Sequence, residues 1–520
     1  MRSRFLTGTM MLALFATGFP SVPTTVAKTR PAPQQGFCRN ADPLPRLDAE
    51  AQARPQQSGR PGSARGDFAR DGSAPPPPPA PPPPPAYVPS ADTAAESVVV
   101  TGSRVDSGSA KTAAPVSAAP PVPGSSAEYR TSPPIIPPRP PRPYPQPQPQ
   151  SGILTAGEHD DLLNPELYAA YVNRSDLGQH IRALPRVDTM RVVTVKVNDR
   201  NGQPVPFADV KVTCSDGNSI TMATQADGTA VFFPGLDRLS ARISVSASKA
   251  GRAIADARPV LVADAPGGQT VGLTASQMAA RATKLDLMLV IDTTGSMGDE
   301  IRYLQAELRS IIAAITAKHR DLDIRVGFVF YRDEGDEYVT RTVAFDRDIG
   351  RAQGVLAQQY ASGGGDYPEA MDQALIRAVG QEWRPDAVKS LLLVADAPPH
   401  NHLFGRTWTA AEAARAKRIH VTPVAASGVG DEAEYAMRAM AAATQSRYLF
   451  LTDDSGVGNP HAPPAIDCYL VTRLDALVRR VIDSQISGRR IEPEDREIIR
   501  SVGQYDAGKC ILPRDFNWQS

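Results

Sequence analysis

The amino-acid sequence predicts a multidomain protein whose main domain is a doubly wound α/β fold built on a parallel sheet. Residues 285–291 are apolar except for Asp286, which is typical of a strand buried on both faces of a sheet. A second apolar run, residues 390–395, is followed by another acidic residue, Asp396. Strand-like and helix-like segments alternate around these two runs up to about residue 488, as they do where helices join parallel strands.

Each expected element rests on the period of its apolar residues. Further strands are expected at residues 324–331, 338–345, 419–425 and 447–452. Helices are expected at residues 299–318, 348–359, 369–379, 409–417, 432–443 and 473–485. This alternation supports a parallel sheet independently of any motif.

Oxygen-bearing side chains follow the ends of the two buried strands. Asp292, Thr294 and Ser296 stand at alternate positions after the first strand, Asp396 ends the second, and Asp366 lies in a glycine-rich turn that opens a helix. Open α/β sheets bind their ligands beyond the carboxyl ends of their strands, so these side chains are expected to lie at one edge. Carboxylate and hydroxyl oxygens suit Mg2+ or Ca2+. The alternative for the first group alone is simple helix capping.

The three motifs DTTGS (292–296), GGGD (363–366) and ADAPPH (395–400) resemble, in order, the three loops of a von Willebrand factor type A (VWA) domain with a metal-ion-dependent adhesion site. The resemblance covers residues 284–488. It implies a doubly wound, mostly parallel sheet, one bound Mg2+ or Ca2+, and a partner protein whose Asp or Glu completes the coordination. It assigns ligand roles to Asp292, Thr294, Ser296, Asp366 and Asp396. The family usually has Thr where this chain has Asp366, so this residue is either a ligand or a cap for the next helix.

The N-terminal part is expected to contain an export signal and a spacer. Residues 1–27 combine two arginines, an apolar run at 5–19 and an end suited to cleavage before Lys28, as in a secretory signal peptide; an uncleaved anchor is the alternative. No later apolar run is long enough to span a membrane, so the mature chain is expected to lack a transmembrane segment. Residues 28–150 hold 31 of the 50 prolines, which predicts a disordered proline-rich spacer.

Composition and one short segment bear on the cellular location. Residues 96–105, ESVVVTGSRV, resemble a segment near the mature N-terminus of bacterial TonB-dependent outer-membrane receptors. This resemblance implies a Gram-negative envelope protein, in the periplasm or at the cell surface. The formal net charge is zero and the pI is about 7.1, so the overall charge does not indicate a nucleic-acid partner.

Three smaller regions surround the main domain. Residues 151–188 are expected to form one or two short helices. Residues 189–275 contain short alternating runs separated by NGQP, DGN and DG turns, which predicts an antiparallel β-sandwich. The order of these runs resembles immunoglobulin-like, carboxypeptidase-regulatory modules. Residues 489–520 are expected to form a short polar tail.

The four cysteines fit an oxidising compartment, and their wide spacing excludes a short C-x-x-C motif. They allow three pairings. We favour Cys468 with Cys510, because these two residues flank one C-terminal segment.

The predicted function is metal-dependent protein binding outside the cytoplasm, without enzymatic activity. Two alternatives stay open. In the first, the protein is a structural tether of the envelope and the metal only stabilises the VWA fold. In the second, His400, His402 and His461 take part in metal-assisted hydrolysis, although no H-E-x-x-H spacing is present. The acidic turn at 333–337 is either a solvated loop or a secondary cation site.

Overall fold

The computed structural model describes residues 36–50, 149–174, 186–457 and 460–518. By their contacts, residues of the chain divide into two units, Met1–Ala53 with Pro145–Ser520, and Arg54–Tyr144; all described residues belong to the first unit. The predicted signal peptide, the long proline blocks and the segment at 96–105 lie outside the described residues.

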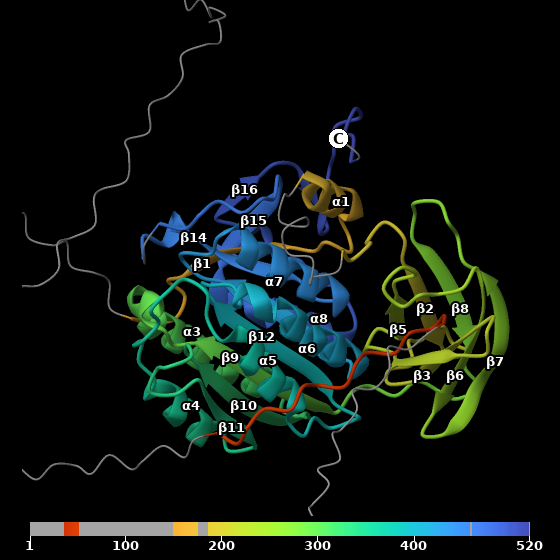
Figure 1. Cartoon of the computed structure of the whole chain (residues 1–520), viewed down its shortest axis with the longest axis horizontal. Coiled ribbons are helices and arrows are strands. Elements are labelled where there is room, and N and C mark those ends of the chain that lie inside the picture. Colours follow the sequence, from red (N-terminus) through yellow and green to blue (C-terminus); the bar gives the residue numbers. More distant parts are fainter. Residues whose placement is uncertain (1–35, 51–148, 175–185, 458–459, 519–520) are drawn as a thin grey trace, which may run out of the picture. The chain divides into compact units, whose positions relative to one another are not determined.

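A sheet of nine strands, in the order β11-β10-β9-β12-β13-β14-β1-β15-β16, contains both apolar runs of the sequence (Figure 1). Its strands are β1 (Thr155–His159), β9 (Lys284–Asp292), β10 (Asp323–Tyr331), β11 (Thr340–Asp346), β12 (Val388–Ala395), β13 (His420–Ala425), β14 (Tyr448–Thr452), β15 (Tyr469–Arg473) and β16 (Arg500–Val502). Strands β10, β9, β12, β13 and β14 run parallel, and all other neighbours in the sheet are antiparallel. The sheet is therefore mixed, and the predicted parallel arrangement describes only its five central strands.

Helices cover both faces of this sheet because successive side chains of the central strands point to opposite sides. On β9, Leu287 and Leu289 join one hydrophobic cluster, which α3, α4 and α8 complete. Met288 and Val290 join a second cluster with α5, α6 and α7 (Figure 1). The helices are α3 (Ile301–Lys318), α4 (Ile349–Ala357), α5 (Met371–Gly380), α6 (Phe404–Ala416), α7 (Asp431–Ala443) and α8 (Leu474–Ser487), with short 3-10 turns η1 (Gly295–Asp299), η2 (Asn401–Leu403), η3 (Asp453–Ser455) and η4 (Asp495–Glu497).

The expectation that residues 151–188 are helical is wrong for their first part. Strand β1 pairs antiparallel with both β14 and β15, and the only helix described in this segment is α1 (Pro165–Arg174). The sequence TAGEH shows neither a clear alternation nor an apolar run. Its Glu158 is buried and accepts hydrogen bonds from Arg447 (2.6 Å) and Arg480 (3.2 Å), which come from elements about 300 residues away. The strand is thus defined by long-range partners rather than by its own pattern.

The C-terminal residues are more than a polar tail. Strand β16 extends the sheet beside β15, and β17 (Tyr505–Asp506) and β18 (Lys509–Cys510) form a small hairpin. Because residues 469–473 belong to β15, the helix expected from 473 begins at Leu474 instead.

The prediction that residues 28–150 are a disordered spacer is wrong for residues 36–50. Cys38 forms a disulfide with Cys214. Glu50 accepts hydrogen bonds from the hydroxyl groups of Thr340 and Thr342 and from the backbone N–H of Thr342, on edge strand β11. This segment therefore has fixed contacts at both ends, while the remaining proline-rich sequence lies outside the described residues.

Residues 193–274 form two sheets around one hydrophobic core that includes Val195, Val210 and Val245. Their strands are β2 (Val193–Asn198), β3 (Asp209–Cys214), β4 (Ser219–Ala223), β5 (Thr229–Phe232), β6 (Arg242–Lys249), β7 (Arg252–Leu261) and β8 (Gln269–Thr274), in the orders β5-β2-β8 and β4-β3-β6-β7. Strands β2 and β8 are parallel, whereas the prediction was of a wholly antiparallel sandwich.

Candidate metal centre

The first and third motifs meet at the carboxyl edge of the parallel strands. Asp292 is the last residue of β9, and Asp396 directly follows β12, the neighbouring parallel strand, in which Val394 stands opposite Ile291. Beyond β9 the chain turns into η1, so that Thr294 and Ser296 return toward the same carboxylate. Thr294 donates to Oδ1 of Asp292 from its backbone N–H (2.9 Å) and from its hydroxyl (2.7 Å). The hydroxyl oxygens of Thr294 and Ser296 are 3.1 Å apart.

Two buried carboxylates lie at this edge, Asp292 beside the side chain of Tyr331 and Asp396 beside that of Ser296. Asp292 and Asp396 are 0% and 2% exposed. Oδ2 of Asp292 and Oδ1 of Asp396 are buried and have no hydrogen-bond partner within the described part of the chain. Burial raises the pKa of Asp292 to about 6, and burial together with the charge of Asp292 raises the pKa of Asp396 to about 7. Unpaired buried carboxylate oxygens of this kind fit a hard divalent cation.

The second loop contains two acidic residues, Asp366 and Glu369, in different surroundings. Asp366 is exposed, and its side chain does not join Asp292 and Asp396 in any described hydrogen bond. The buried carboxyl group of this loop belongs to Glu369, which is 2% exposed. Burial and then the charge of Asp292 raise the pKa of Glu369 to about 9, and its Oε2 has no hydrogen-bond partner among the described residues.

Backbone contacts hold this second loop against the other two. The backbone N–H of Gly295 donates to the carbonyl of Gly363 (2.9 Å), and that of Glu369 donates to the carbonyl of Pro398 (2.9 Å). Gly364 has a positive φ of 73°, and a Cβ atom there would lie 2.9 Å from Oε1 of Glu369 and 3.2 Å from Cβ of Thr294. Glycine at this position therefore lets the Glu369 carboxyl group approach the first loop. In the sequence, Glu369 is simply an acidic residue just before a helix, and this pattern is equally typical of a helix cap.

The donor set is made of oxygen atoms. Within the described residues, no group of three or more His, Cys, Asp or Glu side chains is arranged to hold a metal ion. A cation here would use one oxygen each from Asp292 and Asp396 together with the hydroxyls of Thr294 and Ser296. These groups fit Mg2+ or Ca2+, which take oxygen ligands and commonly retain water.

Two of the three histidines near this edge, His400 and His461, are engaged with carboxylates. Nε2 of His400 lies 2.7 Å from Asp333, and His402 is exposed. His461 bridges Glu300 (2.7 Å) and Asp453 (2.8 Å). In the acidic turn at 333–337, Asp336 accepts from the backbone N–H groups of Asp333 (3.1 Å) and Gly364 (2.8 Å), which gives that carboxylate a role in loop structure.

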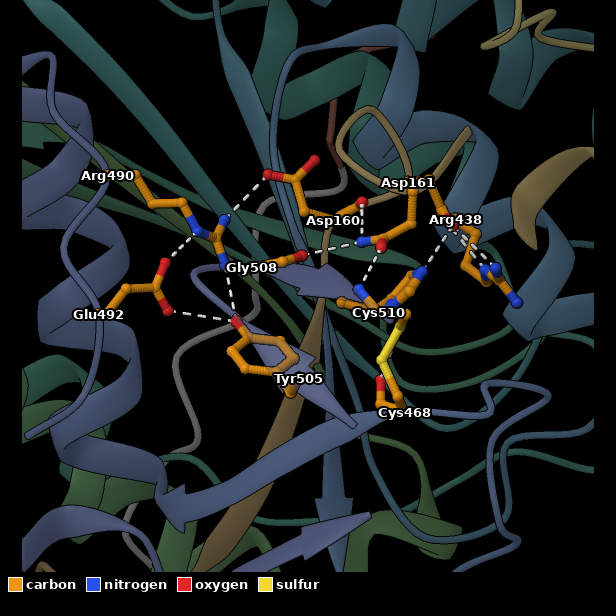
Figure 2. The surroundings of a disulfide bond; sticks show 11 residues. Asp160, Asp161, Arg438, Cys468, Arg490, Glu492, Tyr505, Gly508 and Cys510 are labelled. Atoms are coloured by element: carbon orange, nitrogen blue, oxygen red, sulfur yellow. Dashed lines mark hydrogen bonds and ion pairs between the residues drawn. A yellow bond between two sulfur atoms is a disulfide. The ribbon is translucent and has the colours of Figure 1, made fainter. Parts of the chain in front are cut away.

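The favoured cysteine pair is bonded, and it fastens the C-terminal hairpin (Figure 2). Asn164 accepts from the backbone N–H of Cys510 (2.7 Å) and donates to the carbonyl of Gly508 (2.9 Å). Arg490 pairs with Asp160 (3.0 Å) beside this hairpin (Figure 2). The second disulfide, Cys38–Cys214, accounts for the remaining two cysteines.

Comparisons with known proteins place the candidate centre in a recognised domain. Residues 286–459 match the family of von Willebrand factor A domains. The chain is 31% identical over 124 residues to alpha-protein kinase vwkA of Dictyostelium discoideum, covering 24% of this chain and 20% of that protein. It is 33% identical over 120 residues to an ariadne-like RING finger protein of Acanthamoeba polyphaga mimivirus, covering 22% and 11%. The chain thus spans a fifth or less of the length of these relatives.

Solved structures with similarity to this chain include two from Bacteroides. One is the conserved hypothetical protein BatB of Bacteroides thetaiotaomicron, with 11% identity, a TM-score of 0.27, and 39% of this chain and 98% of that chain covered. The other is an aerotolerance-related membrane protein of Bacteroides fragilis, with 12% identity, a TM-score of 0.27, and 39% and 99% covered. Across the described residues of the present chain, no helix has the length and apolar character needed to cross a membrane. The edge that carries Asp292 and Asp396 lies within the matched region, and residues 286–459 of this chain are a von Willebrand factor A domain.

Proposed function

We propose that this chain is an exported protein that binds other proteins through a divalent cation, Mg2+ or Ca2+, held by its VWA domain. The observation that carries this proposal is a pair of buried oxygens on Asp292 and Asp396, beside the hydroxyls of Thr294 and Ser296, that have no hydrogen-bond partner among the residues the structure describes. Two neighbouring carboxylates that cannot both be solvated need a positive charge between them. A VWA domain is in general a module for protein interaction, which agrees with a binding role.

Each residue has a separate part in the proposed mechanism. Asp292 and Asp396 neutralise most of the charge of the ion, and Thr294 fixes the orientation of Asp292 through its two hydrogen bonds. Ser296 is exposed, so the site opens to solvent on its side. When bound, the cation supplies one open coordination position for a carboxylate oxygen of the partner. An Asp or Glu of the partner would then decide affinity, and removal of the cation would release it.

Export is supported by the cysteines. All four form disulfides, one of which fastens residues 36–50 and the other the C-terminal hairpin. Structural disulfides persist in oxidising compartments such as the periplasm or the cell exterior. The signal-like sequence at residues 1–27 agrees with this location.

A capture experiment tests the proposal against the tether alternative. Envelope proteins are passed over immobilised full-length protein in Mg2+, in Ca2+ and in EDTA, and the same is done with Ser296→Ala and with the distant control Asp256→Asn. We expect a partner that is retained only with cation, lost with Ser296→Ala and kept with Asp256→Asn. If EDTA lowers the melting temperature but leaves retention unchanged, the cation serves the fold and the tether alternative holds.

A further inference from the structure

The loops around the candidate metal centre share a charge pattern that the proposed function does not explain. Six loops lie at or contact the carboxyl edge of the parallel strands: 293–300, 332–339, 358–370, 396–403, 426–430, and 453–457 with 460–468. Together they contain twelve Asp or Glu residues and one Arg or Lys residue, Arg332. Since the whole chain has equal numbers of acidic and basic residues, these loops are acidic relative to the rest of the protein. From outside the loops, Arg500 pairs with Asp454 (2.8 Å) and Arg341 with Glu337 (3.6 Å), which offsets two of the twelve acids.

The single arginine does not offset this charge at the surface. Arg332 is 2% exposed and donates to Glu337 (3.2 Å) and to the carbonyls of Thr293 (3.2 Å) and Tyr360 (3.2 Å). Its guanidinium group also lies over the rings of two tyrosines. It therefore holds loops together and offers no positive charge to a partner.

Several of the acids face solvent around the centre. Glu334, Asp366 and Asp453 are exposed, as is Asp431 at the start of α7, whose first turn also contains Glu432. They lie at the same edge of the sheet as Asp292 and Asp396, the two carboxylates of the candidate site. A divalent cation would neutralise those two and leave the surrounding surface negative.

We propose that the partner of this domain presents its metal-binding Asp or Glu within a basic surface or segment, so that lysines or arginines on both sides face the acidic loops. This inference rests on the proposed function, because it concerns the partner of the same site. An isolated acid on an acidic or neutral protein would reach the cation through a repulsive field, whereas flanking positive charges turn that field into attraction. The cation recognises the central acid, and the loops select its neighbours.

Peptides and the metal alone test the inference on the full-length protein. Binding of Mg2+ and Ca2+ is first measured by calorimetry. Four peptides of about nine residues are then titrated in saturating cation: a central Asp flanked by Lys, by Ser or by Glu, and a central Asn flanked by Lys. The Lys-flanked Asp peptide is expected to bind about tenfold or more tighter than the Ser-flanked one at low salt, with the ratio falling at about 0.5 M salt.

Variants localise the effect. The double variant Glu334→Gln, Glu432→Gln is expected to reduce the preference for the Lys-flanked Asp peptide about threefold or more without changing cation affinity. The control double variant Asp256→Asn, Asp264→Asn changes two exposed acids far from the edge in sequence and is expected to keep the wild-type preference. Equal affinities for the three Asp peptides in cation would overturn the basic-partner inference and leave the proposed function standing. Failure of the protein to bind either cation, or equal binding of the Asp and Asn peptides, would overturn the proposed function and the inference with it.

Discussion

The hydroxyl of Thr294 donates a 2.7 Å hydrogen bond to Oδ1 of Asp292, while Oδ2 of the same carboxylate is buried without a partner among the described residues. One oxygen of Asp292 is thus fixed by the protein and the other is left for a ligand. Asp396, which directly follows the adjacent strand β12, has an Oδ1 that is likewise buried and without a partner in the described part of the chain. Two charged carboxylates in this condition raise the free energy of the folded state until a proton or a cation neutralises them.

We expect Asp292→Asn to raise the melting temperature in EDTA and to abolish stabilisation by Mg2+ and Ca2+. The amide oxygen of Asn can still accept from Thr294, but one buried charge is gone. In the wild type, a cation at about 100 times its Kd stabilises the fold by about 2.7 kcal/mol. Scanning calorimetry with and without cation measures both effects, with Asp256→Asn as the control. If the Asp292→Asn variant is stabilised by cation as much as the wild type, Asp292 is not a ligand of the cation.

Cation-induced stabilisation should shrink as the pH falls from about 8 to about 5. Burial raises the pKa of Asp292 to about 6 and that of Asp396 to about 7, above the value near 3.8 expected in the unfolded chain. Without cation, the folded state therefore holds more protons than the unfolded state in this range, and its stability falls as the pH rises. Bound cation must displace these protons, so it stabilises less at low pH.

The measurement is the difference in melting temperature between cation-saturated and EDTA samples across that pH range. Buried His420, whose pKa burial lowers to about 4, destabilises both samples alike at low pH and cancels in the difference. A difference that stays constant with pH would show that neither carboxylate contacts the ion.

Neutralisation of Glu369 should change cation affinity more than neutralisation of Asp366. We expect Glu369→Gln to raise stability in EDTA, because the buried carboxyl group of Glu369 has a pKa raised to about 9. The same variant should lower cation affinity about tenfold, because it removes a carboxylate near the cation. Asp366→Asn, at an exposed position, should change cation affinity less than about threefold, in keeping with a solvent-screened charge. Calorimetric titration of Mg2+ and Ca2+ separates the two. A larger loss with Asp366→Asn would restore the ligand role that the motif resemblance implied.

These two residues also show where prediction from sequence ends at the site. The spacing of Asp292, Thr294 and Ser296 places three oxygens on one turn, and such local geometry is encoded in the sequence itself. The burial of Glu369 instead follows from the close approach of Gly364 to the first loop and from the hydrogen bond of Glu369 to the carbonyl of Pro398. Sequence distance does not reveal such contacts.

The same division applies to the fold. Strands β9 and β12 are buried along nearly their whole length because both faces are covered, and the apolar runs that this burial requires make their pattern clear. Strand β1 contains a glycine and a buried glutamate, and it is held by β14 and β15 nearly 300 residues later in the chain. A five-residue strand with no pattern of its own could not be predicted from periodicity. The parallel pairing of β2 with β8 was missed for a related reason, since periodicity does not specify strand direction.

Gly157→Ala tests the position of β1 in the sheet. A Cβ atom at Gly157 would lie 2.4 Å from two ring carbons of Phe450 and 3.0 Å from the ring of Tyr469. Because a packed core cannot absorb this overlap without displacing a ring, we expect a loss of about 2 kcal/mol or more in the free energy of unfolding. Gly272→Ala, in strand β8, is the matched control, since nothing lies within 4 Å of a Cβ there. Urea denaturation compares the two; similar small effects would mean that β1 does not lie between β14 and β15.

The disulfides should contribute unequally to stability. Cys38 and Cys214 are 176 residues apart and Cys468 and Cys510 are 42 apart, so in the chain-entropy model the bonds contribute about 5 and about 4 kcal/mol. We therefore expect Cys38→Ala with Cys214→Ala to destabilise the protein slightly more than Cys468→Ala with Cys510→Ala in urea denaturation. The Cys38→Ala, Cys214→Ala variant should also expose residues 36–50 to trypsin at Arg46, because it removes the covalent attachment beside Arg39. What then holds this part of the segment is non-covalent: the ion pair of Arg39 with Glu412 and the backbone hydrogen bonds of residues 38 and 39 to residues 237 and 238. In the Cys468→Ala, Cys510→Ala variant, residues 36–50 stay bonded through Cys38 and should resist cleavage as in the wild type. Equal cleavage of both variants would mean that the contacts of Glu50 with Thr340 and Thr342, rather than the disulfide, hold this segment in place.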